Sequence, residues 1–143
     1  MRKLVLFLLI LCNTALAYTP DHNKWINFYN TPKVKYYASM QCPLLYSPGN
    51  NYKSYSLTSD VMTVSANGTH RITTYQVHVD TTEAVKKYDI KELSYSVYDN
   101  NDILTAKKML PIIGWRQFTK DKNSLDYRIF IIFGEIFYAH HKQ

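Results

Sequence analysis

The sequence predicts an α+β domain in which an amphipathic helix packs across a mainly antiparallel β-sheet. Three features support this fold class: hairpin patterns at about 59–80 and 93–110, and a helical apolar stripe from Ser124 to His141. Strands joined by short turns pair in antiparallel fashion, and such a sheet needs a second layer to cover its apolar side. No repeat or linker divides the chain, so we expect one domain over residues 18–143.

An apolar leader precedes this domain. Two basic residues, Arg2 and Lys3, stand before an apolar run that ends in Ala15-Leu16-Ala17. This order is typical of a secretory signal peptide. We therefore expect residues 1–17 to be a signal peptide that is cleaved between Ala17 and Tyr18, which makes the protein secreted or periplasmic.

The leader is too short to be a stable membrane span. Its nine apolar residues, Leu4 to Cys12, reach about 14 Å as a helix, whereas a bilayer core needs about 20 residues. We expect no transmembrane span after cleavage. A lipid anchor on Cys12 is the less favoured alternative, because Leu11 stands where a lipoprotein signal has a small residue.

The hairpin at 59–80 has the clearest pattern. Apolar and polar residues alternate on both sides of Asn67-Gly68, a dipeptide that accepts the positive φ angles of a type I′ turn. After Ile72 the apolar residues move from even to odd positions. This shift predicts a bulge or a change of face within the strand.

The remaining strand patterns are shorter. The hairpin at 93–110 turns at Asp99-Asn100-Asn101-Asp102. Thr82 to Lys87 is predicted to form one helical turn capped by Thr81 or Thr82. Three further strands are expected at Trp25–Tyr29, Lys35–Ala38 and, as an edge strand, Lys53–Leu57.

The C-terminal segment from Ser124 to His141 allows two interpretations. Ser124 suits an N-cap, Asp126 suits the first helical turn, and the two final histidines suit a helix C-terminus. The stretch Ile129 to Phe133 is also β-branched and aromatic enough for a buried strand that turns at Gly134. Length and capping favour the helix.

Charge and cysteine content narrow the functional classes. The formal net charge is +6, but the basic residues are scattered in pairs instead of forming the dense stripe of a nucleic-acid binder. We expect no nucleic-acid partner. After cleavage Cys42 is the single cysteine, so no internal disulfide can form. We interpret it as a buried thiol, with an intermolecular bridge as the alternative.

Tyrosine is unusually frequent, with 13 residues, all after residue 17. Tyrosine suits half-buried strand positions and contact surfaces alike, because its ring is apolar and its hydroxyl is polar. One interpretation is purely structural. The other is a contact surface on one flat face, whose candidate residues are Tyr36, Tyr37, Tyr52, Tyr55 and Tyr75.

The sequence contains no catalytic or metal-binding pattern. His70 and His78 lie on one predicted strand, about 26 Å apart if it is straight, so they cannot share an ion. The sequence has no pair of His or Cys residues at the spacing of metal ligands, no G-x-S-x-G motif of a nucleophilic serine and no glycine-rich phosphate-binding loop. We therefore expect no metal, no cofactor and no catalytic residue.

These observations favour an exported, non-catalytic binding module whose partner is a protein or a polysaccharide. The alternative is a small cell-envelope hydrolase with an unrecognised site. A deep pocket holding at least two side chains from one set would support the hydrolase. That set is His70, His78, Asp80, Asp99 and Glu135.

Several stretches share their order with one known group of proteins. They are Trp25–Tyr29, Tyr75–Asp80, Tyr95–Asp99 with Ile103-Leu104, and Gly114-Trp115 before Ser124. This layout, from about Trp25 to Ala139, resembles small exported bacterial proteins of the surface-adhesin E-like group. The resemblance implies an envelope or secreted protein that binds host or matrix components, and carries over no binding residue. Members frequently end the helix with a cysteine that can pair with an earlier one, whereas Tyr138-Ala139 stands here and leaves Cys42 without such a partner.

Overall fold

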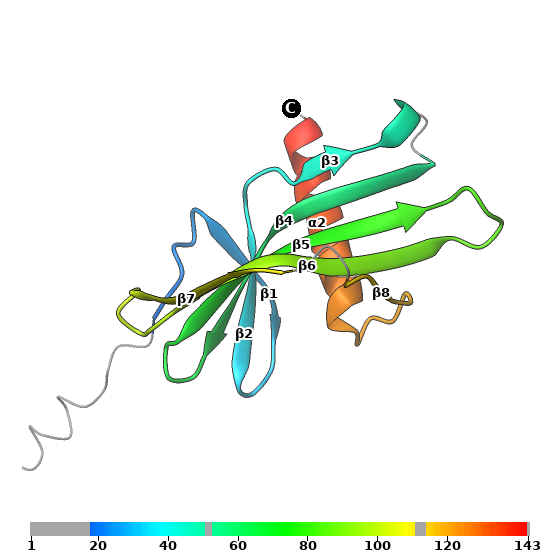
Figure 1. Cartoon of the computed structure of the whole chain (residues 1–143). Helices are drawn as coiled ribbons and strands as arrows, with labels where there is room; N and C mark the ends of the chain where they lie inside the picture. The colour runs from blue at the N-terminus through cyan, green and yellow to red at the C-terminus, as the bar shows by residue number, and fades with distance from the viewer. Residues whose placement is uncertain (1–17, 51–52, 111–113, 143) are drawn as a thin grey trace, which may run out of the picture.

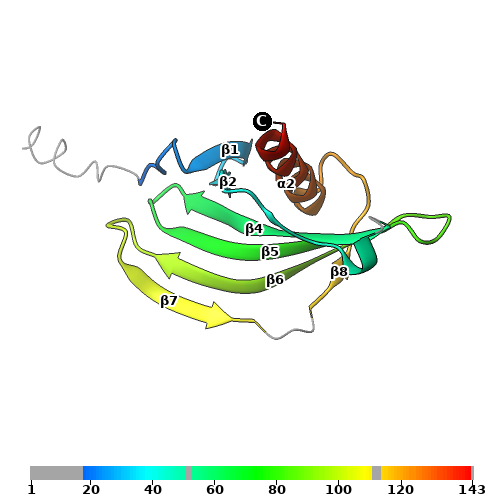
Figure 2. The same ribbon diagram turned by 90° about the horizontal axis from the view of Figure 1, so that it is seen from above.

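The chain folds as an antiparallel sheet with one C-terminal helix on one of its faces, which confirms the predicted α+β class (Figure 1, Figure 2). A computed structural model describes residues 18–50, 53–110 and 114–142. The expected signal peptide, residues 1–17, and the candidate contact residue Tyr52 lie outside these ranges. Among the described residues, no helix is both long enough and apolar enough to cross a bilayer.

Eight strands form the sheet within the described residues, in the order β1-β2-β4-β5-β6-β7, with β3 added to β4 and β8 added to β6. All of these pairs are antiparallel. The elements are β1 Trp25–Asn30, β2 Val34–Ser39, β3 Leu44–Tyr46, the 3-10 turn η1 Pro48–Asn50, β4 Ser54–Ser65, β5 His70–Asp80, β6 Lys87–Tyr98, β7 Leu104–Met109, β8 Arg116–Gln117 and the helix α2 Leu125–His141.

The first predicted hairpin is confirmed as β4 and β5, but its turn is not of type I′. Ser65 donates its amide to the carbonyl of Thr69 and accepts the amide of Gly68, both at 2.9 Å. Of the turn residues only Gly68 has a positive φ, 84°, whereas a type I′ turn needs two. The loop is therefore a three-residue connection that ends in a left-handed glycine.

The predicted irregularity after Ile72 lies in the neighbouring strand. β5 pairs with β4 without interruption, and its register against β6 shifts between Thr74 and Tyr75, where β6 contains the additional residue Leu93. The odd residues of β5 face the helix throughout, and the even residues, Ile72 included, face the other side. The apolar residues of β5 move from even to odd positions because different segments of the chain cover the two faces of the strand.

Two smaller predictions were wrong. Lys53–Leu57 is not an edge, because β4 lies between β3 and β5 there. Thr82 to Lys87 does not form a helical turn. The Asp80 carboxylate accepts hydrogen bonds from the amide and hydroxyl of Thr82, at 2.8 and 2.6 Å, and such a local side-chain turn competes with helix formation.

The second predicted hairpin is confirmed as β6 and β7, with β6 starting earlier than expected, at Lys87. Its turn is organised by Asp99, whose carboxylate accepts the amides of Asn101 and Ile103. Asp102 adopts a positive φ of 64°, which is rare for a residue with a side chain.

The tail is a helix, and the strand alternative for Ile129–Phe133 is wrong. Ile129, Ile132 and Phe133 are buried against the sheet. Ser124 stands at the N-cap position without a side-chain cap hydrogen bond. Asp126, in the first turn, instead receives two hydrogen bonds from the Arg116 guanidinium at 2.7 and 2.8 Å, so an ion pair to β8 holds this end of the helix.

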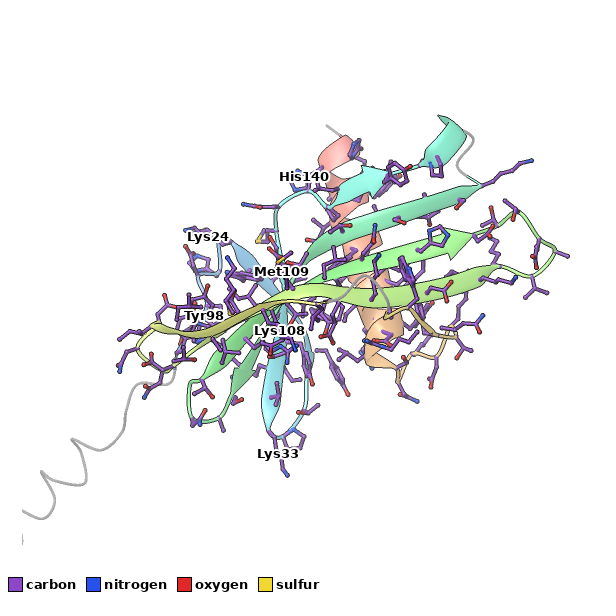
Figure 3. All side chains as sticks on the ribbon, viewed as in Figure 1. Lys24, Lys33, Tyr98, Lys108, Met109 and His140 are labelled. Atoms are coloured by element: carbon purple, nitrogen blue, oxygen red, sulfur yellow. The ribbon has the colours of Figure 1, made fainter. Side chains whose placement is uncertain are left out.

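The core lies between α2 and the inner strands. Phe133 and Ile129 of the helix and Val77 and Ile90 of the sheet are all 0% exposed. Burial of each such side chain contributes about 1.5–3 kcal/mol. At the C-terminal end of the helix, His140 lies beside the chain that leads into β3, with its Nε2 atom 2.9 Å from the carbonyl oxygen of Met40 (Figure 3).

Cys42 is half-buried instead of fully buried. Among the described residues its thiol forms no disulfide, and its Sγ atom lies 3.7 Å from the carbonyl oxygen of Pro43.

Gly68 and Gly134 allow a matched test of how closely the first hairpin turn packs. A Cβ atom on Gly68 would lie 3.0 Å from Cβ of Asn100 and 3.1 Å from the amide nitrogen of Tyr18, whereas one on Gly134 would meet nothing within 4 Å. Gly68→Ala should lower the free energy of unfolding by at least about 1–2 kcal/mol, because alanine resists the left-handed conformation. Gly134→Ala should raise it by up to about 1 kcal/mol, since alanine is the better helix former. Denaturant unfolding measures both, and equal effects would contradict the left-handed conformation and close surroundings of Gly68.

Candidate functional site

The face of the sheet opposite α2 carries a polar surface bounded by aromatic side chains. Because alternate residues of a strand share a face, the strand register aligns two rows across it. One row is Tyr46, Ser56, His78 and Asp89, and the other is Leu44, Thr58, Gln76 and Lys91. We call these residues, with Ser54 and Trp115, the open face.

His78 lies at the centre of the open face and is held by two serines. Its Nδ1 atom is 3.0 Å from Oγ of Ser56, and its Nε2 atom is 3.3 Å from Oγ of Ser54. The Trp115 ring stands edge-on to the imidazole, with 5.9 Å between ring centroids. A neutral imidazole has one donor and one acceptor nitrogen, so one serine accepts while the other donates.

Lys91 and Asp89 project onto the open face beside Trp115. The Lys91 ammonium lies 4.3 Å from the centroid of the Trp115 ring, and the residue is only 9% exposed. Within the described residues, neither Lys91 nor Asp89 forms an ion pair, even with the other. The open face therefore holds, two residues apart on β6, a donor and an acceptor that have no ion-pair partner among the described residues.

Large exposed side chains stand at the ends of the rows. Tyr46 and Leu44 on β3 are 66% and 73% exposed, and Trp115 is 44% exposed. The residues between them are small or polar and half-buried or buried. Four hollows on the described part of the protein are all lined by other residues.

The five tyrosines expected to form one contact surface do not share a face, so that prediction was wrong for the four described. Tyr75 is 8% exposed, and Tyr55 packs against the same core under α2. Tyr36 packs on the rings of Phe28 and Tyr29. Tyr37 faces the other side, since it pairs with Met62.

The five polar candidates for a hydrolase site are likewise dispersed. Glu135 is the one that lines a described hollow, on the helix side. Asp99 organises the β6–β7 turn. Asp80 lies two residues from His78, but hydrogen bonds from Thr82 commit its carboxylate and are the main cause that lowers its pKa, with a smaller contribution from His78.

His70 belongs to a separate, closed cluster. Its ring is stacked between Tyr18 and Tyr98, with centroid distances of 3.7 and 5.0 Å, and the residue is 2% exposed. Its Nε2 atom lies 2.8 Å from the Asp102 carboxylate. Burial, then the charge of Asp102, raises the pKa of the Tyr18 phenol. This cluster fastens the start of the domain to both hairpin turns and leaves His70 no room for a substrate.

The part of the chain that the structure describes holds no group of three or more His, Cys, Asp or Glu side chains arranged to bind a metal ion. No protein-family model matches the chain, and comparisons with curated proteins and with solved structures found no similar protein.

Sequence reasoning missed most of the open face. The alternation in β5 was a usable signal, because it places Gln76 and His78 on one side. Nothing in the sequence indicates that Trp115 returns from the β7–α2 connection to cover Lys91, which is 24 residues earlier in the chain.

Tyr75 generates a prediction for alkaline stability. Burial, then the nearby Glu92 carboxylate, raises the pKa of its phenol from 10.0 to about 12. Below pH 10 the Tyr75 phenol is protonated in both the folded and the unfolded state, so its contribution to the free energy of unfolding is fully present. Between pH 10 and 12 the unfolded state ionises first, so stability falls. Guanidinium unfolding at pH 8 and pH 11 should show the wild type losing about 1 kcal/mol more than Tyr75→Phe. Equal losses would contradict the raised pKa.

Proposed function

We propose that the protein is an exported, non-catalytic binding module that contacts a protein or polysaccharide partner through the open face. One observation carries the proposal: exposed Trp115 and Tyr46 flank rows of polar side chains on a regular sheet. Tryptophan and tyrosine contribute much of the binding energy at recognition surfaces. Strand β3 holds Tyr46 in position, and contacts with His78 and Lys91 hold Trp115, which directly precedes β8, so little conformational entropy is lost when a partner binds.

Export is supported by the leader, residues 1–17, whose order of basic, apolar and small residues is that of a signal peptide. Tyr18, the first residue after the expected cleavage site, already stacks on His70. Cleavage between Ala17 and Tyr18 would thus leave the folded domain intact. A role in adhesion follows the resemblance to the surface-adhesin E-like group and is part of this proposal.

Two tyrosines of similar exposure provide a matched test of the open face. Tyr46 lies on it at 66% exposure, and Tyr138 lies on the helix at 61%. The purified domain is applied to a panel of immobilised polysaccharides and matrix proteins. Trp115→Ala and Tyr46→Ala should each weaken any binding by about tenfold, because each removes an exposed aromatic contact. Tyr138→Ala should leave it unchanged.

Thermal unfolding of each variant serves as the control for folding. Binding that survives both Trp115→Ala and Tyr46→Ala in folded protein would overturn the assignment of the open face.

A second candidate, a small hydrolase, is favoured by the position of His78 between Ser54 and Ser56. In this reading Nε2 accepts the Ser54 proton while Ser56 orients the ring. Two features disfavour it. Ser56 is neutral and stabilises an imidazolium less than a carboxylate would. The amides of β4 and β5 also take part in the sheet ladder, where they are not free to stabilise an oxyanion.

A fluorophosphonate probe distinguishes the two functions, because it labels serines that an adjacent base activates. We expect no labelling of the folded domain above that of Ser54→Ala. Labelling that disappears in both Ser54→Ala and His78→Ala would establish the hydrolase instead.

A further inference from the structure

The geometry points to a neutral, hydroxyl-rich polysaccharide as the ligand of the open face, recognised by Asp89, Lys91 and Trp115. This inference rests on the proposed function and narrows its partner to one class. It follows from three properties of the open face: the order of polar and apolar groups, the unpaired charges, and the distance between the aromatic rings.

The order of groups is the reverse of that in a protein–protein interface. Such interfaces have an apolar centre and a polar rim. The open face has hydroxyl, amide and imidazole groups at its centre, from Ser56, Gln76 and His78, and apolar side chains at its margins. A hydroxyl group donates and accepts hydrogen bonds at once. Ser56 is 5% exposed and both ring nitrogens of His78 already contact serines, so among these three groups the Gln76 amide is the one left to pair with sugar hydroxyls.

The charges select a neutral ligand. Asp89 and Lys91 are two residues apart on β6, so both side chains point to the open face. Among the described residues they do not form an ion pair with each other. An anionic ligand would be attracted by Lys91 but repelled by Asp89. A cationic ligand would be attracted by Asp89 but repelled by Lys91. A hydroxyl group satisfies both, because it donates to the carboxylate and accepts from the ammonium.

The aromatic spacing selects a chain of sugars over a single one. Tyr46 on β3 and His78 on β5 are separated by two strand spacings, about 10 Å, and Trp115 lies beyond His78. One sugar ring cannot contact both aromatic rings. A linear polysaccharide can place one ring on Trp115 and a later one on Tyr46, because the negative face of an aromatic ring attracts the C–H groups of a sugar.

The experiment compares soluble ligands by affinity electrophoresis of the purified domain. The probes are neutral glycans (dextran, hydroxyethyl cellulose, galactomannan and mannan), acidic alginate and acidic polyglutamate. We expect retardation by at least one neutral glycan, with little dependence on salt, because no net charge is neutralised.

The decisive variant is Asp89→Asn, with Glu135→Gln on the exposed helix surface as the matched control. For a neutral glycan, Asp89→Asn should weaken binding by about tenfold, since a charge-assisted hydrogen bond is lost. For an acidic ligand the same change should strengthen binding, because a repelling charge is removed. Glu135→Gln should alter neither. Lys91→Met should also weaken neutral-glycan binding, whereas Lys142→Met, which removes an exposed lysine that likewise lies over an aromatic ring, that of Tyr138, should not.

The outcomes separate this inference from the proposed function. Binding confined to alginate, polyglutamate or a matrix protein, but lost in Trp115→Ala, overturns the neutral-polysaccharide inference and keeps the open face as the binding site. Neutral-glycan binding that Asp89→Asn does not weaken overturns the inference as well. Binding that persists in Trp115→Ala and Tyr46→Ala overturns both.

Discussion

The contact of Ile129 and Phe133 with the inner strands is the interaction on which the rest of the structure depends. Isolated hairpins are marginally stable in water, and they gain stability when an apolar face is covered. In this chain the helix supplies that cover, with both residues 0% exposed against Val77 and Ile90. The Arg116–Asp126 ion pair then fixes the N-terminal end of the helix beside β8. Without the helix, both faces of the long hairpins would be equally exposed to solvent.

The one-sided cover sets the place of any binding surface. Because α2 packs on one face of the sheet, we expect the strand residues of a binding surface to lie on the opposite face. Part of that face is closed at the turn end, where Tyr18 and Tyr98 enclose His70. The open face lies on the same side of the sheet, and the register of the sheet spaces its strand residues, while Trp115 reaches them from the connection before β8. The proposed binding surface and the packed core thus lie on opposite sides of one sheet.

The histidines illustrate why the candidate site was only partly predictable. His70 and His78 look alike in the sequence, because they are eight positions apart on a single strand and on the same face of it. Their surroundings come from other segments: Tyr18, Tyr98 and Asp102 close around one, while Ser54, Ser56 and Trp115 hold the other beside solvent. The tyrosines show the same limit. Tyr75 and Tyr37 are equally plausible contact residues in the sequence, yet Tyr75 is buried beneath the helix.

The sequence by itself determined the α+β class and both long hairpins and favoured the C-terminal helix over a strand, because local period and turn residues specify these elements. Gly68 marked the first turn correctly, although the exact turn type depended on hydrogen bonds between Ser65 and Thr69. Tertiary structure alone decided that β4 is central, that Thr82 to Lys87 is not helical, and that Lys91 lies under Trp115. The physical reason is range: periodicity reports interactions between near neighbours, whereas the exposure and partners of a side chain depend on segments that the fold brings together from distant parts of the chain.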